Sequence, residues 1–343
     1  MNHKFISIIG AAALAIGFAP HSDACTGMEL KTKNGEVVMA RTIEWSGSDM
    51  NTFYVVVPKA YTPDTKYAFT GVAVELPQYI MEGVNEKGLS AGLFYFPDYG
   101  KYEEEANGKT SVSDFELVGY ILSRCATIDE VKSTIADLHI HGIDPRSSTV
   151  HWRFIEESGR QVVLEIIDGK QVFYENTLGV LTNSPSFDYH LTNLNNYVNL
   201  MPGRAGANTI GRLEMTSFSG GTGMLGLPGD FSSPSRFVRV AFLQNTAPVK
   251  ETALETVTQA FHLLNNFDIP IGMQFAKGEE VVDIPSATHI TVTSDLSGHK
   301  LYFRTLHNCE IRCIDLNRIN FKKTGYVCKP LDKVKAETIH QIF

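Results

Sequence analysis

Short runs of β-branched and aromatic residues, separated by turn-forming residues, recur along most of the chain. This pattern is typical of antiparallel β-strands, and the Asn34-Gly35 pair between the runs 28–31 and 37–42 predicts an early hairpin. The same pattern predicts further strands over 53–57, 79–84, 89–95, 149–155, 161–167, 171–174, 289–293, 301–305 and 311–314.

Helical periodicity occurs in two blocks between the strands. Thr127 and Glu130 form a capping box before a segment whose apolar residues at 128, 131, 135 and 138 share one face. Two more helices are predicted over 237–244 and 254–264. Antiparallel strands with interspersed helices predict an α+β protein in which helices cover stacked sheets. No repeat, linker or boundary divides the sequence after its first residues, so we expect one domain.

The first 24 residues have the pattern of a secretory signal peptide. Lys4 precedes an apolar run over 5–18, and the small residues Ser22 and Ala24 predict cleavage after Ala24. The run is shorter than the roughly 20 apolar residues that span a bilayer as a helix. We therefore expect an exported protein, periplasmic or secreted, with no membrane insertion in its mature form and a single domain over 25–343.

Charge and composition exclude several classes of protein. The 343 residues include 30 Lys and Arg against 38 Asp and Glu, a formal net charge of −8, and no basic run is longer than Lys322-Lys323. Nucleic acids and anionic membrane surfaces are therefore not expected partners. With 43% hydrophobic and 20% charged residues, the composition is that of a folded protein rather than a disordered or fibrous one.

Cleavage after Ala24 would leave Cys25 at the N-terminus. Its α-amine, with an ordinary pKa of about 7.7 to 8, could then act as the base for its own thiol. A lipid anchor on Cys25 is the alternative, but Ser22 stands where a lipoprotein has a large aliphatic residue. The other cysteines are Cys125, Cys309, Cys313 and Cys328, and four cysteines allow three disulfide pairings. Their spacing is not that of a metal site. We therefore expect no metal, and no other cofactor is expected.

One glycine-rich motif is excluded by its context. Gly221-Thr-Gly223-Met-Leu-Gly226 matches a dinucleotide-binding pattern, but no strand is predicted before it and Pro228 prevents the helix that would hold a pyrophosphate. The segment 203–229 is expected instead to form a long loop, and such loops in compact domains are usually functional or interfacial.

Five segments keep the order and approximate spacing of a known family. They are Cys25-Thr-Gly, Ala40-Arg41-Thr-Ile-Glu44-Trp, Gly83-Val-Asn85-Glu-Lys-Gly88-Leu, Leu181-Thr-Asn183-Ser-Pro and Leu227-Pro-Gly-Asp-Phe-Ser-Ser-Pro-Ser-Arg236-Phe. Together they resemble the choloylglycine hydrolase family, the conjugated bile salt hydrolases and penicillin V acylases. The resemblance implies an N-terminal nucleophile hydrolase, an αββα sandwich of two stacked antiparallel sheets that cleaves linear amides.

The resemblance also implies a mechanism. Cys25 would attack the amide carbonyl, pass its proton through its own α-amine to the departing amine, and form a thioester that water hydrolyses. Arg41 is implied to lie beside Cys25, where a permanent cation favours the thiolate. Glu44 stands where the family has Asp, and its carboxylate is expected to accept hydrogen bonds from the α-amine.

Three more residues complete the implied catalytic site. Asn183 is expected to direct its side-chain amide at the developing oxyanion, with the backbone N–H of Tyr95 as the second donor. Arg236 is expected to be a second cation near Cys25. Asn85 belongs to a matching segment but is assigned to the turn between two predicted strands.

Substrate preference within the family divides at Tyr95. Bile salt hydrolases tend to have Asn at this position and penicillin V acylases Tyr, so the sequence leans slightly toward penicillin V. Phe94 and Phe96 are expected to form part of an apolar wall for the acyl group. Conjugated bile salts and acyl-homoserine lactones are the alternatives, and each is a small N-acyl amide substrate with an apolar acid. The loop 202–229 resembles the segment through which family members assemble, which implies a homotetramer.

Two other classes of protein are compatible with parts of the sequence. A papain-like hydrolase would use Cys25 with a histidine and an asparagine, and it would tolerate an N-terminal extension. A lipid-anchored periplasmic binding protein would carry acyl chains on Cys25 and would have no thiol there to titrate.

Overall fold

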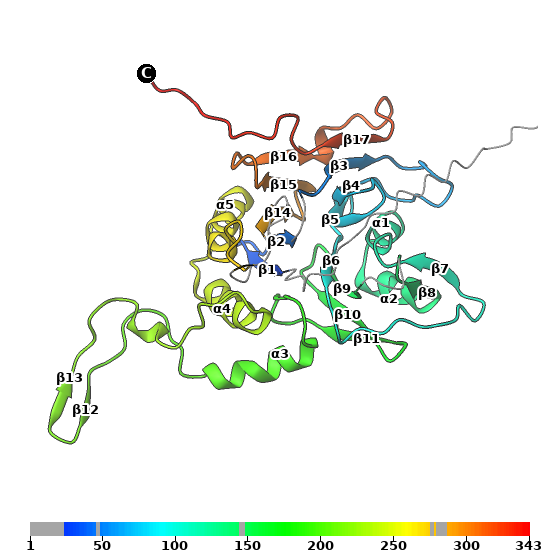
Figure 1. Cartoon of the computed structure of the whole chain (residues 1–343). Coiled ribbons are helices and arrows are strands. Elements are labelled where there is room, and N and C mark those ends of the chain that lie inside the picture. The colour runs from blue at the N-terminus through cyan, green and yellow to red at the C-terminus, as the bar shows by residue number, and fades with distance from the viewer. Residues whose placement is uncertain (1–23, 46–48, 144–147, 275–277, 279–286) are drawn as a thin grey trace, which may run out of the picture.

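Two antiparallel sheets lie face to face, with helices on both outer sides (Figure 1). The computed structural model describes residues 24–45, 49–143, 148–274, 278 and 287–343. The order of the layers is helix, sheet, sheet, helix, which confirms the predicted αββα sandwich. The expected signal peptide lies outside the described residues, apart from Ala24.

The smaller sheet has five strands and begins with the nucleophile candidate at its edge. Helices α4 (Ser233–Thr246) and α5 (Ala253–Leu264) pack on its outer face. Gly35, with a φ of +86°, makes the turn of the hairpin that the sequence predicts. The strands follow the order β1 (Cys25–Lys31), β2 (Val37–Trp45), β14 (Ala287–Asp295), β15 (Lys300–Thr305) and β16 (Arg312–Asp315).

The larger sheet has eight strands, and helices α1 (Leu117–Leu122) and α2 (Ile128–Ala136) pack on its outer face. Asn85 is the last residue of β5, directly before the turn, and its amide donates to the carbonyl oxygens of Leu122 at 2.9 Å and Cys125 at 2.7 Å. The strands follow the order β11 (Lys170–Glu175), β10 (Gln161–Ile167), β9 (Val150–Ile155), β6 (Ser90–Tyr95), β5 (Ile80–Asn85), β4 (Phe69–Val74), β3 (Thr52–Val57) and β17 (Val327–Pro330).

Alternation along β2 determines which side chains enter the space between the sheets. Met39 and Ile43 pack into the core between the sheets, whereas Val38 and Ala40 pack against α4 and α5. Because side chains alternate along a strand, Arg41 points the same way as Met39 and Ile43, into the space between the sheets.

Several elements were not predicted from the sequence. Strand β4 contains Gly71, where an added Cβ would lie 2.7 Å from the Ile80 side chain. Close packing thus requires glycine at a position where a β-branched residue would have indicated a strand. The predicted helix after Thr127 ends at Ala136, before Leu138, because Leu138 begins a short parallel strand pair. Other unpredicted elements include α1, β7 (Thr110–Ser113) with β8 (Leu138–His141), α3 (Phe187–Asn193) and β17.

The long loop extends away from the sandwich as an arm (Figure 1). It carries a small hairpin of β12 (Asn208–Ile210) and β13 (Leu213–Met215), and the glycine motif forms only a short 3-10 turn over Thr222–Met224. The interpretation of this motif as a loop is therefore confirmed. Among the described residues, no helix has the length and apolar character needed to cross a membrane.

Candidate active site

Cys25 is the first residue of β1 and is almost fully buried, with 2% of its surface exposed. Its backbone N–H donates to Asn183 Oδ1 over 2.6 Å. Ala24 precedes it, and the Ala24 carbonyl accepts from the Glu44 N–H at 3.0 Å. The nitrogen of Cys25 is thus a peptide N–H here, and residue 24 is hydrogen-bonded to β2 just before β1 begins.

A short backbone bridge brings Asn183 to Cys25. Gly27 and Leu181 exchange two hydrogen bonds of 2.7 and 3.1 Å, which place the segment around Leu181 beside β1. The Asn183 amide nitrogen donates to the Tyr95 carbonyl at 2.8 Å. The expected orientation of Asn183 toward an oxyanion therefore differs from this structure, in which its oxygen holds the Cys25 N–H and its nitrogen holds β6.

Arg236 lies in the first turn of α4 and clamps the start of β1. One guanidinium nitrogen donates to the Cys25 carbonyl and, at 2.8 Å, to Thr26 Oγ1. The other donates to Asn183 Oδ1 at 2.8 Å, so Arg236 joins Cys25 to Asn183. This arrangement agrees with the expected second cation near the nucleophile.

Arg41 reaches the space between the sheets from β2. Its guanidinium donates to backbone carbonyl groups, Thr42 at 3.2 Å, Met81 at 3.3 Å and Leu93, and it lies 3.8 Å from the centre of the Phe94 ring. Burial raises the pKa of the Cys25 thiol, while the charges of Arg41 and Arg236 lower it. With Ala24 attached, the balance keeps the thiol pKa above its ordinary value.

Glu44 is buried on the strand next to Cys25. Its Oε1 accepts from Thr288 Oγ1 at 2.9 Å, and Oε2 has no hydrogen-bond partner among the described residues. Burial raises the pKa of Glu44 to about 7, against the lowering effect of Arg236. The expected bond to an α-amine is not formed here, because the Cys25 nitrogen is acylated and bonded to Asn183.

Phe94 and Phe96 are interior residues rather than parts of an open wall. Both have 0% of their surface exposed. Phe94 underlies the Arg41 guanidinium, and Phe96 stacks on His151 with ring centres 4.4 Å apart. Phe94 lies on β6, whose pleat turns alternate residues toward the space between the sheets, and Phe96 follows the strand directly. In this structure the Phe94 ring packs against Arg41 and within an apolar cluster that includes Cys25, and the Phe96 ring packs against His151.

Four buried residues near the site were not identified from the sequence. His190 Nε2 donates to the Asn183 carbonyl at 2.8 Å, and His151 Nε2 donates to the Thr182 carbonyl at 3.0 Å. Burial lowers the pKa of His190 to about 4, so it stays neutral near pH 7. Glu82 and Arg153 are the other two, and Glu82 lies within 3.7 Å of both Arg41 and Arg153. A charged residue within an otherwise apolar strand is the sequence feature that could indicate such a residue, as Arg153 does in the strand Val150–Ile155.

The histidines, possible metal ligands and cysteines of the chain bear on the alternative kinds of site. Within the described ranges, the hydrogen-bond partners of the Cys25 backbone are Asn183 and Arg236 rather than a histidine, and no group of three metal-ligating side chains occurs. None of the five cysteines, all of which are among the described residues, forms a disulfide in this structure.

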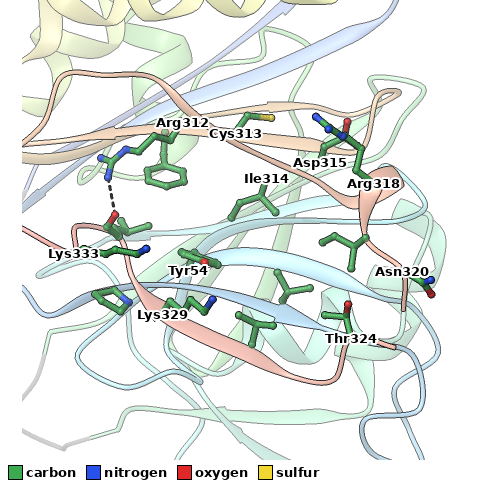
Figure 2. Close-up of a pocket in the computed structure, with 16 residues that line it drawn as sticks. Tyr54, Arg312, Cys313, Ile314, Asp315, Arg318, Asn320, Thr324, Lys329 and Lys333 are labelled. Carbon is green, nitrogen blue, oxygen red and sulfur yellow. Dashed lines mark hydrogen bonds between the residues drawn. The ribbon is translucent and has the colours of Figure 1, made fainter. Parts of the chain in front are cut away.

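A cavity of about 650 Å³ lies at the opposite edge of the sandwich (Figure 2). Its lining includes Tyr54, Phe303, Ile314, Lys329 and Lys333 from the edge strands and the residues around them. Four strand spacings, roughly 19 Å, separate β16 from β1 in the sheet order. None of the expected catalytic residues lines this cavity, so it is separate from the site at Cys25.

An αββα sandwich whose first strand starts at a buried cysteine, held by Asn183 and Arg236, has the architecture of the N-terminal nucleophile hydrolases. Residues 25–329 match the model of the linear amide C–N hydrolases, choloylglycine hydrolase family. The chain belongs to this family, and it is an amidohydrolase acting on linear amides.

Relatives of both activities occur among similar proteins. The chain is 31% identical over 312 residues to the bile salt hydrolase/transferase of Clostridium perfringens, covering 86% of this chain and 93% of that protein. It is 29% identical over 273 residues to the penicillin V acylase of Pectobacterium atrosepticum, covering 73% of this chain and 65% of that protein.

Solved structures agree with the fold. A mutant conjugated bile acid hydrolase from Clostridium perfringens matches with a TM-score of 0.80 at 29% identity, covering 93% of this chain and all of that one. The penicillin V acylase of Agrobacterium tumefaciens matches with a TM-score of 0.71 at 23% identity, covering 90% and 91% of the two chains, and shares the fold.

Proposed function

We propose that this amidohydrolase is a bile salt hydrolase that uses Cys25 as an N-terminal nucleophile. The observation that carries the amide chemistry is the constellation of Cys25, Asn183 and Arg236 at the start of β1. Similarity supports the substrate class. Relatives named bile salt hydrolase/transferase from Clostridium perfringens and Bifidobacterium longum are 31% and 33% identical, above the 29% of the penicillin V acylase relative.

The proposed reaction begins after removal of residues 1–24, which turns the Cys25 N–H into an amine. That amine takes the thiol proton, and the sulfur attacks the carbonyl between the steroid acid and its glycine or taurine. The proton then goes to the departing amine, and water hydrolyses the thioester. Asn183 and Arg236 hold the Cys25 backbone in place throughout.

Tyr95 favours penicillin V as the second candidate substrate. Its backbone is fixed by Asn183, so its place beside the site does not depend on a flexible loop. A single residue is nevertheless a weaker guide than similarity over most of the chain. Acyl-homoserine lactones are a third amide class to include in the assay.

The test compares kcat/KM of the processed protein for glycocholate, taurocholate, penicillin V and an acyl-homoserine lactone. We expect the bile salts to be preferred, Cys25→Ala to abolish turnover, and Cys125→Ala, which changes a buried cysteine after α1, to leave it intact. A preference for penicillin V would overturn the substrate and keep the mechanism. Full activity in a protein that retains residue 24 would exclude the N-terminal nucleophile.

We also propose that the protein is exported and cleaved after Ala24. The predicted signal sequence supports this proposal. The mass and N-terminal sequence of the product recovered from an exporting host provide the test. A chain that begins at Cys25 is expected, whereas a lipid-modified chain would indicate the anchored binding protein.

Assembly as a homotetramer is a further part of the proposal. The arm that carries β12 and β13 supports it, because Ile210 and Leu213 are 66% and 63% exposed and Phe218 is fully exposed. Light scattering should give four times the mass of one mature chain. A monomeric mass would contradict the proposal.

A further inference from the structure

Three charged side chains meet in the space between the two sheets, behind the nucleophile. Glu82 Oε2 lies 3.7 Å from Arg41 Nη1 and 3.6 Å from Arg153 Nη2. All three side chains are at most 1% exposed. Arg41 comes from the five-stranded sheet and the other two from the eight-stranded sheet, so Glu82 links the two sheets electrostatically.

The register of the eight-stranded sheet explains how Glu82 and Arg153 meet. Gly92 on β6 is opposite Glu82 on β5 and also opposite Arg153 on β9. A Cβ on Gly92 would lie 2.0 Å from Glu82 Oε2. The missing side chain therefore leaves the space in which a glutamate and an arginine two strands apart reach one another.

A second glycine makes room on the nucleophile's own strand. Gly27 is opposite Arg41 in the β1–β2 pair, and its Cβ would lie 2.7 Å from Arg153 Nη1 and 2.9 Å from the Phe94 ring. Gly27 is two residues after Cys25. The charged cluster thus extends to the strand that carries the nucleophile.

This cluster is poorly explained as a device for stability. Buried ion pairs are often replaced by apolar residues without loss of stability, because removing charges from water is costly. Here Arg41 Nη2, both terminal nitrogens of Arg153 and Glu82 Oε2 have no hydrogen-bond partner among the described residues. Apolar side chains would fill this layer with fewer unsatisfied groups.

We propose that Glu82 is a positioning residue that holds the Arg41 guanidinium beside Cys25. Arg153 offsets part of the negative charge of the Glu82 carboxylate. The proposal rests on the proposed role of Cys25. Backbone carbonyl groups and the Phe94 ring hold Arg41 but carry no net charge. Ser90 Oγ donates to Glu82 Oε1 at 3.0 Å, which fixes the carboxylate itself.

Loss of Glu82 would leave two cations near one ring. Arg41 and Arg153 lie 3.8 and 5.4 Å from the centre of Phe94, and their repulsion would no longer be opposed by a carboxylate. Arg41 is expected to move away from its present place. A displacement of about 1 Å at an active site can reduce turnover roughly 100-fold.

The experiment uses the Glu82→Gln and Glu82→Asp variants of the processed protein, which begins at Cys25. We expect Glu82→Gln to lower kcat roughly 100-fold with little change in KM, and Glu82→Asp, which keeps the charge, to recover part of it. The control is Asp114→Asn, which removes a buried carboxylate bonded to Tyr102 and distant in the topology from Arg41. It should lower the unfolding temperature without changing kcat.

A second readout separates positioning from a simple charge effect. The pH dependence of Cys25 alkylation by iodoacetamide reports the thiol without requiring amide turnover. The charged groups around Cys25 are Arg41 and Glu44 from β2 and Arg236 from α4, together with the new α-amine. If Glu82 positions Arg41, Glu82→Gln displaces that cation, and alkylation shifts to higher pH.

The opposite outcomes are distinct. A shift to lower pH in Glu82→Gln would show that Arg41 stays in place and that Glu82 only weakens its field, which would overturn the proposal. Unchanged kcat and an unchanged alkylation profile would overturn it as well. Failure of the proposed function would appear instead as amide turnover that survives Cys25→Ala, whatever the alkylation profile of Glu82→Gln.

Discussion

Glu44 is a buried acid with one carboxylate oxygen bound to Thr288 and the other without a partner among the described residues. Its pKa of about 7 lies above the ordinary value of 4.5 because burial disfavours the charged form. A group with a raised pKa in the folded state contributes stability below its unfolded pKa and loses that contribution as the pH rises through its folded pKa.

The uncleaved Cys25→Ala protein should therefore lose stability as the pH rises from about 5 to about 8. The loss attributable to Glu44 is on the order of 3 kcal/mol, because each pKa unit corresponds to about 1.4 kcal/mol. Adding Glu44→Gln should remove this part of the pH dependence. Urea unfolding at several pH values measures it, and parallel profiles for the two proteins would contradict the prediction.

Arg236 tests whether geometry or charge holds the nucleophile. Its two terminal nitrogens contact Cys25, Thr26 and Asn183 at once, which a lysine ammonium cannot reproduce. Arg236→Lys should lower kcat by at least roughly 10-fold in steady-state assays. Arg239→Lys, one turn further along α4 and bonded to the Pro228 carbonyl, is the matched control and should retain activity.

The sequence motifs identify single residues of the site but do not indicate which of them contact one another. Cys25, Asn183 and Arg236 were named from motifs, and the structure brings them together. The link between Arg41 and Glu82 could not be predicted, because it depends on how one sheet lies on the other. No local pattern in either strand specifies that contact.

At the scale of elements, β6 combines catalytic support with dense packing. Gly92→Ala should push a methyl group against Glu82, and overpacking of this kind costs about 1 to 3 kcal/mol. We expect a lower unfolding temperature together with reduced kcat. Gly206→Ala, where an added Cβ meets nothing within 4 Å, should change neither, and a fully active Gly92→Ala protein would show that the space tolerates a side chain.

Elements were predictable where local sequence and tertiary demand agree. The hairpin β1–β2 and the capped helix α2 follow from turn and cap residues in the sequence. Strand β4 is not predictable in this way, because it contains Gly71, a residue with low strand propensity. Glycine is needed there because the Ile80 side chain of the neighbouring strand leaves no room for a Cβ. Short elements such as α1 form only because the sheet beneath them buries their apolar residues.

At the scale of the whole molecule, the arm extends away from the sandwich and exposes apolar side chains to solvent. Replacing Ile210 and Leu213 by Glu should lower the mass measured by light scattering, because charges would be buried in any interface they form. Val334→Glu changes another exposed apolar residue, outside the arm, and should leave the mass unchanged. An unaltered mass in the arm variant would show that these two residues do not hold the assembly together.

The peptide bond between Ala24 and Cys25, whose N–H donates to Asn183, has a consequence for the cell that makes this protein. A chain that keeps residue 24 has an amide nitrogen on Cys25, and an amide has no available lone pair to receive the thiol proton. Under the proposed mechanism such a chain is a latent catalyst, harmless to amides in the compartment of synthesis. Its activity would begin only after the cut, on whichever side of the membrane that cut is made.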